Sequence, residues 1–305
     1  MQRHGRPRLA IGGGLERAPA AGSPTHHRHL SEKEPRVRTD WSDLPEDLRT
    51  EIEAHTGPVV DVEPAPTGNH ADIASTLYTT GGPVFVKAAR KLADRDGPEV
   101  KSLRREASVN PVVTELAPRL RWQVEAGEWL ALGFDHVQGR PADFSPGSPD
   151  LDVLAKTIQA IHNAPCPDAV RLVVERRWQK HTADVAFLAG HTLLHTDLNQ
   201  DNFIITSDGR AYVVDWAFVS RGAAWVELGL LIPWLLKAGH SPNEAEAWVS
   251  QFPSWEQTAA ADIDTFAAAF AMQWRKASQM REDPWVHLHA DLTGRWDDHR
   301  RQLAT

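Results

Sequence analysis

The residues with the clearest chemical potential are the acidic and amide side chains between His195 and Asp215. Two short apolar runs, 203–205 and 211–214, flank the turn-forming sequence Ser207-Asp208-Gly209, and this pattern predicts a β-hairpin. Asp197 and Asn202 precede the first strand of that hairpin, and Asp215 ends the second. Because a hairpin folds its second strand back onto its first, we expect Asp215 to lie near Asn202, with Asp197 on the loop that enters the hairpin.

An amide oxygen and two carboxylates at one end of a hairpin suit phosphoryl transfer. Magnesium accompanies nucleotide phosphates, prefers oxygen ligands and takes only one or two of them from the protein. Asn202 and Asp215 are the candidate magnesium ligands, which leaves Asp197 to orient an incoming hydroxyl group and accept its proton. The pattern H-x-D-x-x-x-x-N, followed by an Asp at the end of a strand, is that of the kinase catalytic loop.

This stretch resembles the aminoglycoside phosphotransferase family, small-molecule kinases with a protein-kinase-like fold, whose loop typically reads H-x-D without an intervening Arg. The resemblance covers roughly residues 60–300. It implies an α+β, bilobal fold with an antiparallel sheet in the N-terminal lobe and a mainly helical C-terminal lobe. It also implies ATP and Mg²⁺ as cofactors, and a hydroxyl group of a small molecule as the acceptor.

The N-terminal part of the chain contains further residues at positions that a kinase uses. Lys87 lies in the predicted strand 84–88, and Glu106 lies in the predicted helix that follows it. The resemblance implies that Lys87 binds nucleotide phosphates, that Glu106 holds Lys87, and that the loop containing Gly68 covers the phosphates. It further implies that adenine contacts the backbone around Asp135 and Val137. The elements expected here are strands 59–62, 73–78, 84–88, 120–124 and 129–137, and helices 42–55 and 98–110.

Gly139-Arg140-Pro141 interrupts the strand pattern and is the expected boundary between the lobes. We therefore divide the chain into a disordered tail (1–40), an N-terminal nucleotide-binding lobe (41–137) and a C-terminal helical lobe for catalysis and substrate binding (138–305). The helices predicted in the last part are 150–162, 170–190, 225–236, 241–251, 254–282 and 291–302.

The helix 225–236 departs from the resembled family in one respect. The family usually carries an Asp there that braces the catalytic loop, whereas the only acidic residue here is Glu227. A longer side chain could perform the same task through a shifted contact, so the sequence leaves this role open.

Composition narrows the classes of function. The 305 residues carry a formal net charge of −8, which argues against general binding to nucleic acids or anionic membranes. Cys166 is the only cysteine, so no intrachain disulfide can form, and no apolar run has the length of a membrane span or a signal peptide. We therefore expect a cytoplasmic protein.

Three alternatives compete with a small-molecule kinase. A protein kinase is disfavoured because Asp215 is followed by Trp216-Ala217 and no A-P-E sequence follows. A catalytically silent nucleotide- or ligand-binding module would have the same fold. A metal-dependent hydrolase would use His195 and Asp197 as ligands, but it needs further partners, and His287 and His289 are expected on a surface segment. The acceptor stays open between an aminoglycoside and another amino-sugar or amino-alcohol.

Overall fold

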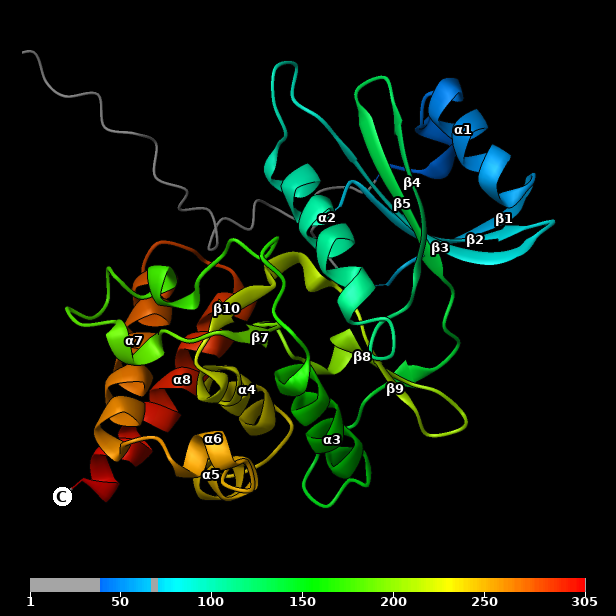
Figure 1. Cartoon of the computed structure of the whole chain (residues 1–305). Helices are drawn as coiled ribbons and strands as arrows, with labels where there is room; N and C mark the ends of the chain where they lie inside the picture. The colour runs from blue at the N-terminus through cyan, green and yellow to red at the C-terminus, as the bar shows by residue number, and fades with distance from the viewer. Residues whose placement is uncertain (1–38, 67–70, 305) are drawn as a thin grey trace, which may run out of the picture. The chain divides into compact units, whose positions relative to one another are not determined.

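The computed structural model describes residues 39–66 and 71–304 (Figure 1). The expected disordered tail therefore lies outside the described residues except for its last two positions. Gly68 and most of its loop also lie outside them.

The predicted N-terminal strands form one five-stranded antiparallel sheet in the order β1-β2-β3-β5-β4. The prediction of these strands is confirmed, except that the last of them ends at Asp135 and not at Val137. The strands are β1 (Val59–Pro64), β2 (Ile73–Thr79), β3 (Gly82–Arg90), β4 (Leu120–Ala126) and β5 (Trp129–Asp135).

The two faces of this sheet are covered by different helices, α1 (Glu46–Thr56) and α2 (Pro98–Val109) (Figure 1). Val86 of β3 packs in one apolar cluster with Ile52 of α1, while Ala89 packs in another with Leu103 of α2. Because successive side chains of a strand point to opposite faces, Lys87 lies on the same face as Ala89 and is directed towards α2.

The chain after β5 forms a second, smaller set of strands. The predicted hairpin is among them, and its prediction is confirmed. The hairpin strands β8 (Phe203–Ile205) and β9 (Ala211–Val213) pair with each other, and the short β6 (Arg140–Pro141) pairs with β8. Gly139 fits this junction because a Cβ atom there would lie 2.6 Å from the Ile205 carbonyl oxygen. Beside this sheet, β7 (Thr192–Leu194) pairs with β10 (Ser220–Gly222).

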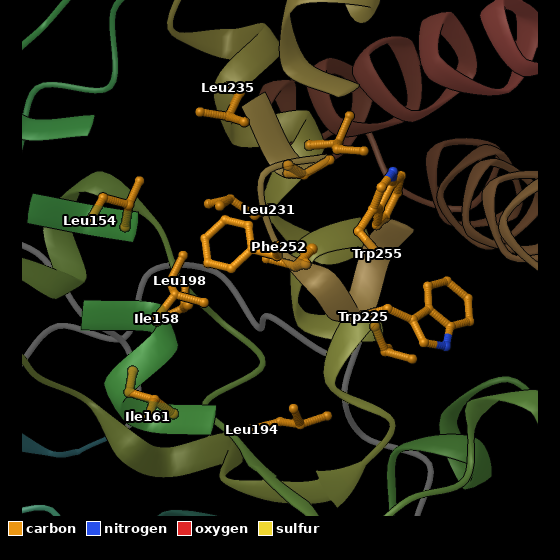
Figure 2. Close-up of a cluster of buried hydrophobic side chains, with 14 of the residues drawn as sticks. Leu154, Ile158, Ile161, Leu194, Leu198, Trp225, Leu231, Leu235, Phe252 and Trp255 are labelled. Atoms are coloured by element: carbon orange, nitrogen blue, oxygen red, sulfur yellow. The ribbon is translucent and has the colours of Figure 1, made fainter. Parts of the chain in front are cut away.

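The C-terminal part is mainly helical, which confirms the predicted α+β class with a sheet in the N-terminal part. Figure 2 shows part of its core, one hydrophobic cluster that contains Ile158 and Ile161 of α3, Leu231 of α4, Phe252 and Trp255. The apolar spacing of three and four residues that predicted α3 is thus the spacing of its buried face. The helices are α3 (Asp150–Asn163), α4 (Ala224–Lys237), α5 (Pro242–Val249), α6 (Pro253–Glu256), α7 (Ala260–Ser278) and α8 (Pro284–Leu303). No helix in the described part of the chain has the length and apolar character needed to cross a membrane.

The prediction of a helix over 170–190 is wrong. That segment is irregular, with two short 3-10 turns at Val174–Arg177 and Ala186–Leu188. Tertiary contacts override the local pattern, since the Trp178 ring lies 4.9 Å from the ring of Phe266 and the Leu172 carbonyl accepts a hydrogen bond from Arg221 N.

Two boundaries near the C-terminus also differ from prediction. The expected helix 254–282 is divided into α6 and α7, because Trp255 turns inward against Trp225 and Trp296. The last helix begins at Pro284, earlier than predicted, with Asp283 as its N-cap. His289 therefore lies inside a helix and is 3% exposed, so the expected surface position for it is wrong.

Candidate active site

The candidate site is marked by unusual backbone conformations. Thr196 (φ 67°) and Asp215 (φ 62°) are the residues other than glycine that have positive φ in the described ranges. Such conformations cost about 1–3 kcal/mol each and persist where the surrounding structure enforces them. The two residues belong to the two ends of the predicted catalytic constellation, so the strain is concentrated at the candidate site.

The loop between β7 and β8 brings Asp197 and Asn202 together. Asn202 Nδ2 donates to the backbone carbonyl of Asp197 at 2.7 Å and to its Oδ2 at 3.2 Å. Asn199 caps the turn that follows, since its Oδ1 accepts hydrogen bonds from Asp201 N and Asn202 N. Val214 N donates to the Asn202 carbonyl at 2.9 Å. The hairpin thus returns the chain to Asn202 one residue before Asp215, as the sequence predicts.

Lys87 contacts two carboxylates from different parts of the chain. Its Nζ lies 3.0 Å from both Glu106 carboxylate oxygens and 3.1 Å from Asp215 Oδ1. Burial acts to lower the pKa of Lys87, but the carboxylates of Asp215 and Glu106 outweigh it and hold that pKa above its ordinary value. The expected Lys87–Glu106 contact is therefore present, and Asp215 joins it.

Asp197 lies in surroundings that favour its protonated form. Burial is the largest cause, and the carboxylate of Asp215 adds to it, so that the pKa of Asp197 is raised to about 7. Hydrogen bonds from Asn199 and Asn202 and the charge of Arg177 act in the opposite direction. A carboxylate with a pKa near neutrality is suited to accept a proton at that pH.

Glu227 braces the loop, which answers the question left open by the sequence. Its Oε2 accepts from His195 N at 2.6 Å and its Oε1 accepts from Thr196 N at 2.8 Å. The side chain is fully buried, and burial raises the pKa of Glu227 to about 7, while the two backbone bonds lower it. The carboxylate thus satisfies two backbone donors of the catalytic loop directly before Asp197.

We expect Glu227→Ala to lower the free energy of unfolding by about 2 kcal/mol or more, because a buried donor left without a partner costs about 1–3 kcal/mol. The measurement is urea denaturation. Glu128→Ala is the control, because Glu128 is exposed in the turn between β4 and β5. Equal losses in the two variants would show that Glu227 does not brace the loop.

The ring of His195 forms hydrogen bonds within the protein through both of its nitrogens. His195 is fully buried; its Nε2 lies 2.9 Å from the Val214 carbonyl and its Nδ1 accepts from Asp197 N at 3.3 Å. Burial lowers the pKa of His195 to about 4, so the ring is neutral and Nε2 carries the proton that it donates. Both nitrogens are occupied, and this argues against the hydrolase alternative with His195 as a metal ligand.

The residues suggested as magnesium ligands have suitable chemistry. Asn202 uses its amide hydrogens on Asp197, which directs the amide oxygen away from that contact and makes it available to a cation. Asp215 supplies a carboxylate and directly follows Val214, whose N–H donates to the Asn202 carbonyl. Among the described residues no group of three or more His, Cys, Asp or Glu side chains could hold a metal ion by itself. A hard cation that takes one or two protein oxygens fits this donor set.

Asp135 and Val137, which the resemblance suggests for adenine, lie at the end of β5 and in the linker after it. Asp135 forms an ion pair with Arg121, and its N–H donates to the Arg119 carbonyl at 2.9 Å. Val137 follows β5 in the partly exposed linker. Gly68 lies outside the described residues. The roles of these three residues stay predictions.

The sequence did not single out two arginines near the site. Arg177 belongs to the segment 170–190 that was predicted to be a helix, and Arg105 lies beside Glu106 in the predicted helix 98–110. In the structure Arg105 donates to the Ala217 carbonyl and Arg177 to the Phe218 carbonyl, directly after Asp215. Contacts to backbone carbonyls leave no side-chain signature, so no signal in the sequence could have identified them.

The sheet, the hairpin and the Lys87 contacts together define a kinase-like fold. Residues 83–261 match the model of the phosphotransferase enzyme family, and this range is more than half of the chain. The chain therefore belongs to that family. No curated protein matches it in sequence.

Solved structures agree with this fold. The aminoglycoside phosphotransferase APH(4)-Ia has a TM-score of 0.54 and 13% identity, with 84% of this chain and 98% of that chain covered. The choline kinase LicA from Streptococcus pneumoniae has a TM-score of 0.53 and 15% identity, over 84% and 99% of the two chains. An aminoglycoside phosphotransferase from Alicyclobacillus acidocaldarius has a TM-score of 0.52 and 12% identity, over 85% and 96%. At these identities the likeness establishes the fold.

Proposed function

We propose that the protein transfers the γ-phosphate of ATP to a hydroxyl group of a small molecule. The observation that carries the proposal is the contact of Lys87 with both Glu106 and Asp215, in a chain whose β7–β8 loop also joins Asp197 to Asn202. A similar structure, LicA in complex with AMP, has a TM-score of 0.54 and supports nucleotide binding. ATP as the donor would locate the reaction in the cytoplasm.

Each residue has a role in the proposed reaction. Lys87 contacts the phosphate oxygens of ATP and Glu106 holds Lys87 in place. Asp197 aligns the acceptor hydroxyl and takes its proton as the hydroxyl oxygen bonds to the γ-phosphorus and the bond from that phosphorus to the leaving ADP breaks. Asn202 and Asp215 would hold Mg²⁺, which when bound neutralises charge on the phosphates. We assign nucleotide binding to residues 41–137, including the Gly68 loop and the linker at Asp135 and Val137, and catalysis and acceptor binding to residues 138–305.

The proposed acceptor is an aminoglycoside or another amino-sugar or amino-alcohol. The names of the similar structures, aminoglycoside phosphotransferases and a choline kinase, support a cationic acceptor. The formal net charge of −8 is compatible with attraction of a cation.

A screen of acceptors tests the proposal against the silent binding module. The purified protein is incubated with ATP, Mg²⁺ and a panel of aminoglycosides, amino-sugars and amino-alcohols, and ADP release is recorded with and without each acceptor. We expect acceptor-dependent ADP release that disappears when Mg²⁺ is chelated. Binding of ATP with no transfer to any acceptor would favour the silent module.

Lys87 and Glu106 should act as a unit in this reaction. Because Glu106 acts only by holding Lys87, Lys87→Met and Glu106→Gln should be strongly non-additive in kcat/KM for ATP, with a coupling free energy of about 0.5–3 kcal/mol. The control cycle uses Lys91 and Glu125, an ion pair of the same sheet at 3.0 Å that is more exposed. Additive losses for Lys87 and Glu106 would contradict their coupled role.

A further inference from the structure

Two arginines hold the backbone immediately after Asp215. Arg105 of α2 donates from Nε to the Ala217 carbonyl at 2.8 Å. Arg177, from the turn Val174–Arg177, donates from Nη2 to the Phe218 carbonyl at 2.8 Å and to Ser220 Oγ at 2.9 Å. The segment 216–220 is thereby fixed from two separate elements of the fold.

Neither guanidinium has an acidic partner at ion-pair distance among residues 39–66 and 71–304. Removal from solvent lowers the pKa of both, that of Arg177 to about 10, while the more distant carboxylates of Glu227 and Asp197 favour its charged form. Both residues are partly exposed, and a cation partly withdrawn from water without a directly paired carboxylate is less favourable than a paired one. An arginine that a fold retains in such a position is therefore a candidate for a functional role.

The Phe218 carbonyl is the point at which Arg177 reaches the catalytic loop. This oxygen accepts hydrogen bonds from Arg177 Nη2 at 2.8 Å, from Thr196 Oγ1 at 2.9 Å and from Ser220 Oγ at 2.8 Å. Thr196 directly precedes Asp197, and Phe218 follows Asp215 by three residues. One carbonyl thus connects the loop that carries the proposed base to the segment that carries the proposed metal ligand.

The contact between Arg177 and the Phe218 carbonyl matters because the backbone is strained on both sides of it, in the catalytic loop and at Asp215. Thr196 and Asp215 both have positive φ, and such conformations persist only where neighbouring contacts enforce them. Glu227 holds the Thr196 N–H, whereas Arg177 fixes the carbonyl to which the Thr196 hydroxyl is bound. Arg105 holds the same segment one residue earlier, and within the described part of the chain its guanidinium bonds to the Ala217 carbonyl and Ser102 Oγ and not to the catalytic loop, so the two arginines differ in what they connect.

We propose that Arg177 is a positioning residue, which keeps Asp197 and Asp215 in their relative arrangement by fixing the Phe218 carbonyl between the catalytic loop and the segment 216–220. Its effect on turnover rests on the proposed function, because it acts through the residues that the phosphotransferase reaction uses. Its effect on the backbone does not depend on the reaction. The proposal can therefore be tested in two independent ways.

The first test is amide hydrogen exchange of the full chain, read by mass spectrometry. We expect Arg177→Gln to accelerate exchange at least tenfold in peptides that cover 195–202 and 216–220, with a smaller effect for Arg177→Lys, which retains the charge and a donor. Arg105→Gln should accelerate exchange in 216–220 and α2 but not in 195–202. Arg90→Gln, at a side chain that is 64% exposed, is the surface control. Wild-type exchange of 195–202 in Arg177→Gln would overturn the proposal.

The second test separates positioning from simple loss of stability. With an acceptor from the screen, Arg177→Gln should lower kcat at least tenfold with KM for ATP within threefold of wild type, and Arg177→Lys should restore part of kcat. Unchanged kcat, or a loss that only follows the unfolded fraction, would overturn the proposal. If Arg177→Gln does not fold, Arg177→Lys must show the same pattern to a smaller extent, and wild-type behaviour of that variant overturns the proposal. A wild-type protein without transfer activity would refute the proposed function, while hydrogen exchange would still decide the role of Arg177.

Discussion

Replacing Asp197 by Asn is expected to lower kcat by about a hundredfold or more with little change in ATP affinity. The substitution keeps the shape of the side chain but removes the charge and the proton acceptor, and general-base catalysis contributes on this scale. An interaction made mainly in the transition state affects turnover more than ground-state binding. Steady-state transfer to the identified acceptor and calorimetry of ATP binding measure the two quantities.

Asp201→Asn is the matched control, because Asp201 belongs to the same loop but is exposed. We expect this variant to turn over like the wild type. Normal kcat in Asp197→Asn would show that Asp197 is not the base. Weaker ATP binding in proportion to the lost kcat would assign it to nucleotide binding instead.

The second large effect is expected at Asp215. Asp215→Asn should abolish Mg²⁺-dependent turnover while the protein stays folded, since Asn tolerates the left-handed conformation of this position and Lys87 keeps Glu106 as its partner. Asp215→Ala should likewise abolish turnover, and Asn202→Ala should raise the Mg²⁺ concentration that is required. ADP release across a Mg²⁺ titration, with circular dichroism to verify folding, measures both effects.

Asp208→Asn, in the exposed turn of the same hairpin, is the control for the Asp215 variants. Its Mg²⁺ dependence should equal that of the wild type. Wild-type turnover of Asp215→Asn at ordinary Mg²⁺ concentration would refute the assignment of Asp215 as a metal ligand.

The sequence predicts the site where it depends on regular elements. The resemblance to the kinase-like family implied the contact between Lys87 and Glu106, and the structure shows why it forms: Lys87 points towards α2 because strand side chains alternate, and Glu106 lies on the buried face of that helix. Asp215 returns to Asn202 because the turn at Asp208-Gly209 closes a hairpin. The hairpin contact follows from the strand and turn pattern, whereas the Lys87–Glu106 contact was an implication of the resemblance.

Contacts that depend on irregular backbone could not be predicted. Whether the longer side chain of Glu227 reaches the loop depends on the position of α4 relative to His195, which no local pattern specifies. The apolar residues around Arg177 predict a helix when their partners are unknown. In the structure Trp178 packs on α7, and the backbone at Val173 pairs with Arg221. Arg105 and Arg177 each contact a backbone carbonyl after Asp215, and any residue could supply such a carbonyl.

Transfer of labelled phosphate tests the central claim most directly. The protein is incubated with Mg²⁺, ATP labelled in its γ-phosphate and the acceptor from the screen, and the phosphorylated acceptor and ADP are both quantified. We predict one labelled phosphate on a hydroxyl group of the acceptor for each ADP formed, with formation slowed about a hundredfold or more in Asp197→Asn. ATP bound equally by both proteins, with no label on any acceptor, would contradict the account.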